Sequence, residues 1–573
     1  MAMKILRILL GLTLVFVLAC GAAATATPPL TSAPQPTTVQ PTARAAVAPA
    51  TPAPTPAPAA KVNPGKLTIM LGSLGNERFD YGFAVGGGGS TQNYGRILHG
   101  FLISSNERTE MIPGTASQWG LSADGLTWTF TIRNGVKFHD GSELTPQDVL
   151  WSLQHQFGPQ AFEYVLPTPA RTSRAMDRIE LIGPDKVSLT TKRPVPELAI
   201  LLSETTNEWY SIMPKRTKLH DTAEEAAYDN NPIGAGVMKL VKHVQASVMK
   251  FERFDDFYYQ PKNGFPEDKR VKFQSLDLVL APEEATRVAA LRAGEVDIVP
   301  ASLATKKQVE AGGGRLVFGQ EGVWEDVLLP GCYKPQYPCH DKRVRQALDY
   351  AIDKELMRDR LWGPEVFQAK GWNTITPSTI GYTPALDPRP FDPNKARQLL
   401  ADAGYAGGKG FGKLIVNTKP STAMPLQVEA AQLAADFWRR ELGLEVEVNV
   451  LDSVGLTKRA QALELNGQII WRDNEARTDA TGNLTAYFGD PEDYRRFHED
   501  PELFRLVQET LQILDPDKRA EATKKLLPRL RDEGYRIGIG YVNIPWGVGP
   551  RVLTWQPYPL SIWPSAFHTI TLK

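Results

Sequence analysis

The chain has 573 residues, of which 42% are hydrophobic and 22% are charged, a composition typical of globular proteins. This length predicts about two to four domains rather than one core. Lys and Arg number 64, as do Asp and Glu, so no net charge attracts nucleic acid or an anionic membrane surface. The balance disfavours a polyanion-binding role and predicts no nucleic-acid partner.

The first residues predict an export signal. Lys4 and Arg7 precede an apolar run from Ile8 to Ala19, which suits the core of a signal peptide but is short for a membrane span. The run ends in V-L-A-C, which resembles a bacterial lipobox, where cleavage leaves Cys20 as a lipidated N-terminus. The alternative is a plain signal peptide with an incidental cysteine. We expect a signal peptide over residues 1–19 and a mature protein anchored outside the cytoplasm.

Residues 20–62 are expected to form the lipidated cysteine and a tether. From Gly21 to Ala60 the chain is almost entirely Ala, Pro, Thr, Ser, Val and Gln, with few large apolar groups to offset the entropy of ordering. Such a segment would reach about 35 Å as a coil and about 120 Å as a polyproline helix.

Residues 119–149 predict a hairpin followed by a helix. Every second residue from Leu126 to Ile132 is apolar, as in a strand with one buried face. Asn134-Gly135 suits a tight turn, and Val136 and Phe138 resume the alternation in an expected second strand.

Further helices are marked by their caps. Thr145 is expected to cap a helix that starts at Pro146, with Asp148 completing a variant capping box. Asp392 likewise precedes a helix that Gly404 ends. Other helical and strand patterns alternate through the chain, for example a helix over 283–293 before a strand at 296–299. The mixture predicts an α/β fold.

Two cysteines remain once Cys20 is assigned to lipid. Cys332 and Cys339 flank a short, turn-prone segment, and an even pair in an exported protein favours a disulfide; two reduced, unrelated thiols are the alternative. The eight histidines include no pair at i, i+4, so we expect no protein-supplied metal site and no cofactor.

Several words, in order, resemble a known family. They are D-G-L-T-W-T-F, V-K-F-H-D-G and L-T-P-Q-D-V within residues 124–149, N-P-I-G-A-G-V-M-K-L at 231–240, A-A-L-R-A-G-E-V-D-I at 289–298, D-K-R-V-R-Q-A-L-D-Y-A-I-D at 341–353 and F-D-P-N-K-A-R-Q-L-L-A-D-A-G-Y at 391–405. Together they resemble the family 5 extracellular solute-binding proteins, which serve ABC importers of peptides, nickel and related solutes.

The resemblance implies a bilobed periplasmic-binding-protein-like fold of type II, with an extra domain inserted in the first lobe. The first lobe would combine residues 63–93, 234–319 and 541–573. The inserted domain would span 94–233 and the second lobe 320–540. Closure of two lobes about a hinge would trap the ligand.

The implied function is capture of a small solute, a peptide or peptide-like compound, by a monomer that delivers it to ABC permease subunits. One alternative is a sensor lipoprotein for a sugar or a metal chelate, such as chelated nickel. The other is an extracellular hydrolase, but the chain has no G-x-S-x-G, H-E-x-x-H or Walker motif. We therefore expect a protein that is not an enzyme.

The resemblance also implies ligand contacts. A G-W-x-x-D-like segment in the second lobe of peptide-binding members corresponds to I-W-R-D-N, so Trp471 would stack on the ligand and Asp473 would pair with its amino group. Asp479 is the substitute if the loop is shifted. Further candidates come from a segment near the C-terminus and from the loop after the first strand: Tyr541, Asn543, Trp546, Glu77 and Phe79.

Overall fold

The computed structural model describes residues 65–80, 92–157, 174–204, 210–219, 222–421, 423–476, 478–484 and 501–573. The chain divides into two compact units at Pro58–Ala59, and all described residues belong to the second. The expected signal peptide, Cys20 and the tether therefore lie outside the described residues. Within the described ranges no helix is both long and apolar enough to cross a membrane.

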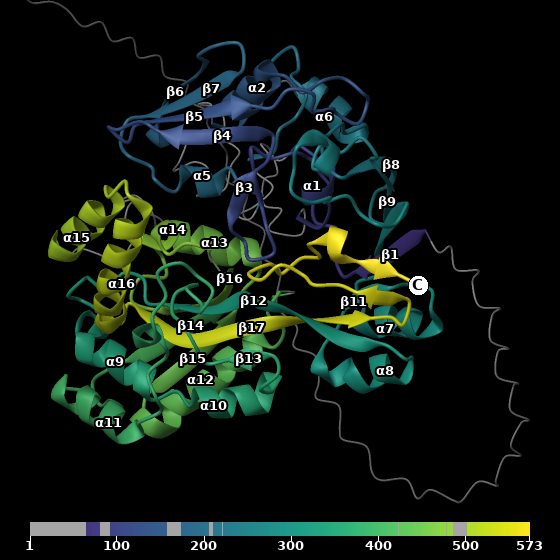
Figure 1. Cartoon of the computed structure of the whole chain (residues 1–573). Coiled ribbons are helices and arrows are strands. Elements are labelled where there is room, and N and C mark those ends of the chain that lie inside the picture. The colour runs from purple at the N-terminus through teal and green to yellow at the C-terminus, as the bar shows by residue number, and fades with distance from the viewer. Residues whose placement is uncertain are drawn as a thin grey trace, which may run out of the picture. The chain divides into compact units, whose positions relative to one another are not determined.

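Eleven of the described strands form one mixed sheet (Figure 1). In spatial order they are β15 (Glu445–Val450), β14 (Lys413–Thr418), β16 (Ile469–Glu475), β12 (Arg315–Leu328), β17 (Arg536–Val548), β11 (Ile298–Pro300), β1 (Lys66–Leu71), β10 (Ser275–Leu280), β9 (Val248–Arg253) and β8 (Met238–Val244), with β13 (Phe367–Gln368) paired to β17. β14 runs parallel to both β15 and β16, whereas β12 is antiparallel to β16 and β17. The carboxyl ends of β14, β15 and β16 therefore meet at one edge.

The two long strands β12 and β17 join the two lobes. Their inner residues are buried on both faces along most of their length. A bulge interrupts their pairing, because Gly319 is opposite Ile544 while Val323 is opposite Val542. Three residues of β12 thus face one residue of β17. Such a bulge is a place where a sheet bends.

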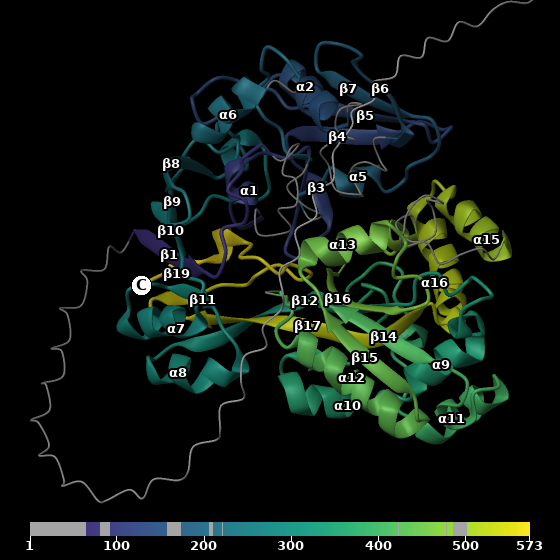
Figure 2. The same cartoon turned by 180° about the vertical axis from the view of Figure 1, so that it is seen from behind.

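Helices cover the sheet of the second lobe on both faces. α12 (Gln427–Leu442) packs on β14 and β15 (Figure 2), and α13 (Ser453–Gln461) packs with Leu328 and Ile470 in a separate core. The other helices of this part are α9 (Lys342–Tyr350), α10 (Lys354–Met357), α11 (Pro393–Asp402), α14 (Thr481–Leu484), α15 (Pro501–Leu511) and α16 (Pro516–Glu533). Asp392 caps α11 by accepting from the backbone N–H of Lys395, as predicted.

The first lobe has its own apolar core. Alternate residues Leu67, Ile69 and Leu71 of β1 are buried there, and Ile298 and Val548 join them from distant parts of the chain. Its helices are α1 (Gln92–Leu98), α7 (Glu284–Ala293) and α8 (Lys306–Ala311). The strand expected at residues 296–299 is β11 and begins two residues later. A small pair, β18 (Val552–Thr554) and β19 (Thr571–Leu572), closes the C-terminal segment.

A separate sheet of four strands builds the inserted domain. Its order is β4 (Ala116–Leu121), β5 (Thr127–Ile132), β7 (Lys186–Thr191) and β6 (Met176–Leu181). Around it lie β2 (Ile103–Ser105), β3 (Met111–Pro113), α2 (Pro146–Phe157), α5 (Leu198–Leu201) and α6 (Thr222–Asn230). β5 buries alternate residues as predicted, and Thr145 and Asp148 bond reciprocally at the start of α2.

The prediction of a second hairpin strand that contains Val136 and Phe138 is wrong. β5 pairs with β4 on one side and with β7 on the other, so neither of its edges is free for residues 136–139. Residues 136–144 instead fold back on themselves in a short turn. Its ends are joined by the N–H of Leu144, which donates to the carbonyl of Val136. Val136 and Phe138 are nevertheless buried, because the turn packs them into the core of the inserted domain.

Two of the sequence words meet where this domain joins the first lobe. The backbone N–H of His139 donates to the carbonyl of Gly234, and the His139 ring bonds Gly234 and Gly236 through its two nitrogens. A Cβ at Gly234 would lie 1.8 Å from the carbonyl oxygen of Leu98, so the approach requires glycine. Burial lowers the pKa of His139 to about 4, and burial likewise lowers the pKa of the neighbouring His99 to about 3.

These two histidines predict a loss of stability on mild acidification. An unfolded histidine takes up a proton near pH 6.5, whereas the folded rings stay neutral until about pH 4 and about pH 3. As pH falls through this window, the unfolded state is favoured by an amount on the order of a few kcal/mol. Urea unfolding between pH 7 and pH 4 measures the loss, and His139→Gln should flatten it. The same change at the exposed His340 is the control, and equal slopes for both variants would contradict the assignment.

Candidate ligand-binding site

A pocket of about 210 Å³ lies at the carboxyl ends of β14 and β15 and alongside β16. Its apolar wall comes from the sheet and from α13, and its polar groups come from β16, from α13 and from the residue after β14. The lining residues are Leu328, Lys419, Ser453, Leu456, Thr457, Ala460, Ile470, Arg472 and Asp473. In open α/β sheets ligands bind in the crevice outside the carboxyl ends of parallel strands, so this position favours a ligand site.

Local sequence explains the geometry of the pocket. Lys419 comes directly after β14, and its carbonyl accepts a bond of 2.6 Å from the side chain of Gln427, the first residue of α12. Asp452 follows β15 and caps α13 by accepting from the N–H of Gly455. Thr457 is thereby placed on the exposed side of α13, at the pocket.

An ion pair joins the strand ends. Lys419 Nζ lies 2.6 Å from Asp473 Oδ1, and their side chains are 16% and 19% exposed. Glu325 is directly opposite Asp473 in the β12–β16 ladder and is fully buried. Burial raises the pKa of Glu325 well above its usual range, and the charge of Asp473 raises it further, so the environment disfavours a charged Glu325.

A second set of charged residues lies on β16 and β12, next to Asp473 and Glu325 in the sequence. Arg472 pairs with Asp326 at 3.2 Å, and Asp326 also pairs with Arg536 of β17. Asp326 and Arg536 are each 1% exposed. This network links the pocket wall on β16 through β12 to β17.

Trp471, expected to stack on a ligand, packs in the core of the second lobe. It is completely buried, lies against Trp438 with ring centroids 6.5 Å apart, and its indole N–H donates to Glu325. Trp471 lies on the face of β16 that α12 covers, and Asp473 is two residues further along on the same face, where it pairs with Lys419. Its ring therefore presents no surface to a solute in this structure.

The three candidates on β17 lie away from the pocket. Tyr541 is 6% exposed and pairs with Trp324 of β12. Asn543 is opposite the bulge, where its side-chain oxygen accepts from the N–H of Glu321. Trp546 is buried in the core of the first lobe beside Trp555.

The remaining candidates make local structural bonds. The carboxylate of Glu77 accepts from His243 at 2.6 Å and from the N–H of Ala246. Phe79 is fully buried in the core of the first lobe. Asp479 is half-buried and accepts from the N–H of Thr481 at the start of α14. Of the expected contacts, Asp473 is the one that lines the pocket.

Sequence reasoning missed Lys419, Arg472, Ser453 and Thr457 as pocket residues, and it missed Glu325 beneath them. A signal existed for two of these residues. Lys419 directly follows a largely apolar strand, where the carboxyl end of a parallel strand places ligand groups, and Glu325 lies directly after the apolar run Val323-Trp324 in β12.

A buried cluster in the first part of the chain offers three potential metal ligands. Atoms of Asp80, His155 and Glu225 all lie within 4.8 Å of one another. However, the guanidinium of Arg216 bonds Asp80 and lies over the ring of Trp151, with its carbon 4.5 Å from the centroid. Although burial opposes it, the bond from His155 and the charge of Arg216 lower the pKa of Asp80. A cation therefore already balances Asp80, which favours an ion-pair network between the segment after β1 and the inserted domain.

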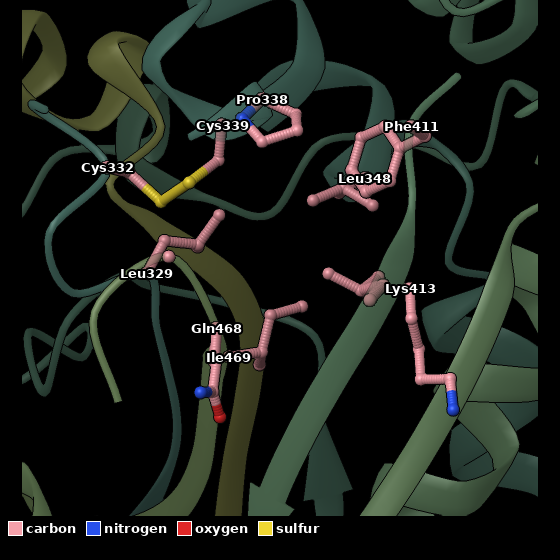
Figure 3. Close-up of a pocket in the computed structure, with 11 residues that line it drawn as sticks. Leu329, Cys332, Pro338, Cys339, Leu348, Phe411, Lys413, Gln468 and Ile469 are labelled. Carbon is pink, nitrogen blue, oxygen red and sulfur yellow. A yellow bond between two sulfur atoms is a disulfide. The ribbon is translucent and has the colours of Figure 1, made fainter. Parts of the chain in front are cut away.

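A disulfide joins Cys332 to Cys339, whose Cα atoms are 5.1 Å apart. It borders a cavity of about 40 Å³ at the amino ends of β14 and β16 (Figure 3). Leu329, Leu348 and Ile469 line this space, which is large enough for a water molecule but not for a solute. The cavity lies at the opposite ends of the strands from Lys419 and Asp473.

The sheet shared by two lobes and the inserted domain define a periplasmic-binding-protein-like fold of type II, as expected. Residues 110–494 match the family model of the bacterial extracellular solute-binding proteins, family 5. The chain belongs to this family, which confirms the resemblance found in its sequence.

Relatives and solved structures agree with this assignment. The chain is 25% identical over 507 residues to heme-binding protein A of Haemophilus influenzae, a match that covers 84% of this chain and 87% of that one. It is 27% identical over 343 residues to the dipeptide-binding protein of Escherichia coli, covering 56% and 58%. The fold is shared with the periplasmic binding protein DppA of Helicobacter pylori in complex with the peptide STSA, at a TM-score of 0.69 and 20% identity over 89% and 98% of the two chains.

The position of Trp471 predicts that its removal destabilises the second lobe. Trp471→Ala should cost about 3–5 kcal/mol, because it leaves a large cavity in a packed core. Trp471→Phe should cost less, because the smaller ring keeps most of the apolar contacts, although it loses the N–H donor to Glu325. Urea unfolding followed by circular dichroism measures both. If Trp471→Ala unfolds at the wild-type urea concentration, the ring does not support the core.

Proposed function

We propose that the protein captures a peptide or peptide-like solute outside the cytoplasm and delivers it to the permease subunits of an ABC importer. Membership of the solute-binding family supports capture. Peptides appear in the names of several relatives, among them a di/tripeptide-binding protein of Pseudomonas aeruginosa that is 26% identical over 491 residues. The protein acts as a monomeric binding protein and not as an enzyme.

The observation that carries the proposal is the pocket at the carboxyl ends of β14 and β15, alongside β16. Its apolar wall accepts the body of a solute, and Lys419, Asp473, Ser453 and Thr457 offer hydrogen bonds at its rim, which is the usual design of a small-molecule site. Bending at the bulge between β12 and β17 closes the first lobe over this wall. Asp473 is a direct contact with the solute in this proposal.

The division into domains follows the cores. Buried residues from β1, β10, β11 and the C-terminal segment share one cluster, which supports a first lobe made of residues 63–93, 234–319 and 541–573. The cluster around β5 and α2 supports an inserted domain over 94–233, and two clusters support a second lobe over 320–540.

A bulky side chain in the pocket tests the location of the site. A solute that binds only the folded state adds about 2.7 kcal/mol of stability at 100 times its Kd, so thermal shift against a library of di- to pentapeptides identifies it. Thr457→Trp should weaken binding of that peptide at least tenfold by filling the pocket. Lys458→Trp, the neighbouring exposed position that does not line the pocket, is the matched control. Equal affinities for both variants would place the site elsewhere.

We also propose that Cys20 carries the lipid that anchors the chain to the cell membrane. The support is the apolar run that ends in V-L-A-C and the proline-rich segment after it. Cys20→Ser should abolish acylation and release the protein from the membrane fraction. Intact-mass measurement of the membrane form checks this, and an unacylated chain that begins at another residue would refute it.

A further inference from the structure

The ion pair between Lys419 and Asp473 is built into the fold. Asp473 is a residue of β16, and Lys419 follows the neighbouring parallel strand β14. Gln427, which is 1% exposed, holds the carbonyl of Lys419 and so fixes where its side chain starts. Both charges are more than four-fifths buried, so water screens their attraction less than at an exposed surface.

Glu325 lies beneath the pair and does not compete for the lysine. It is fully buried, and one of its oxygens accepts from the indole N–H of Trp471. Burial raises the pKa of Glu325 and so disfavours its charged form, and it is Asp473 whose carboxylate contacts Lys419. Lys419 neutralises the charge of Asp473.

The charges around the pocket leave no surplus of negative charge. Lys419, Arg472 and Arg536 supply three positive charges against the three carboxyls of Asp473, Asp326 and Glu325, and burial disfavours the charge of Glu325. An ammonium group that approached Asp473 would have to displace Lys419 and leave that lysine half-buried near Arg472. This displacement has an electrostatic and a desolvation cost that an uncharged group does not meet.

We propose that Lys419 is a specificity-determining residue that occupies Asp473 as an internal ammonium group, so that the pocket selects peptide-like solutes whose amino group is acylated. The amide of such a solute bonds the outer atoms of the pair without breaking it. This inference rests on the proposed function and names the chemical class within it. Specific binding sites commonly exclude an unwanted ligand by placing an unfavourable charge where that ligand would bind.

The ion pair itself is tested without a ligand. Trace labelling of the full chain with acetic anhydride should modify Lys419 at least tenfold more slowly than the exposed Lys458. Asp473→Asn should raise the rate at Lys419 and leave Lys458 unchanged. Equal rates at the two lysines in the wild-type protein would overturn the inference at its first step.

The selectivity is tested with a tripeptide library that contains each sequence with a free and with an acetylated amino group. By native mass spectrometry, the wild-type chain should retain acetylated over free members at least tenfold. Lys419→Met should shift that ratio at least tenfold toward free amines, and Lys419→Arg should keep the wild-type preference. Lys458→Met removes the same charge from outside the pocket and should change nothing.

The outcomes separate this inference from the proposed function. Retention of free amines by the wild-type chain, or equal ratios for Lys419→Met and Lys458→Met, refutes the role of Lys419 while peptide binding stands. Retention of neither form by any variant refutes the peptide-like solute and the selectivity with it, and the labelling rates then report on the ion pair alone.

Discussion

Strands β12 and β17 are hydrogen bonded to each other through both lobes, so the register between them positions nearly everything else. β16 takes its place from β12, and β14 and β15 follow from β16. Asp326 and Arg536 reinforce this register as a pair in which each residue is 1% exposed. Removing one partner of a buried pair leaves an uncompensated charge, so the pair penalises alternative registers. The pocket is a consequence of that register, because it forms where β14 and β15 end beside β16.

The same two strands contain an interruption of the ladder between the lobes. At the bulge, Glu321 has φ of 55°, which is uncommon for a residue other than glycine. Its N–H is satisfied by the side chain of Asn543, and its carboxylate accepts from the N–H and hydroxyl of Ser378. Side chains therefore replace the ladder bonds at this position, and they rearrange at lower cost than a continuous ladder. A bend between the lobes is consistent with that exchange.

Structural features that depend on neighbouring residues could be predicted from the sequence, whereas features that depend on contacts between distant residues could not. The alternation in β5, the caps of α2 and α11 and the α/β class follow from local patterns. The pairing partners of β5 could not be predicted from local patterns, because β4 and β7 occupy its two edges and β7 is distant in the sequence. At the site, a motif located Asp473 but also selected Trp471, because strand alternation puts both side chains on one face and does not show how far along that face a helix covers it. Lys419 escaped notice because its partner lies 54 residues away in the chain.

The arrangement of the pocket also bears on the cost of binding. Lys419 and Asp473 extend from strands that are held by a shared ladder, and Gln427 fixes the backbone of Lys419. Their side chains are already ordered against each other before a solute arrives, so binding does not have to restrict them. A solute that leaves the pair intact gains from this preorganisation, whereas one that breaks it loses both the pair and the order. The fold thus makes discrimination between solutes depend on which groups they leave undisturbed.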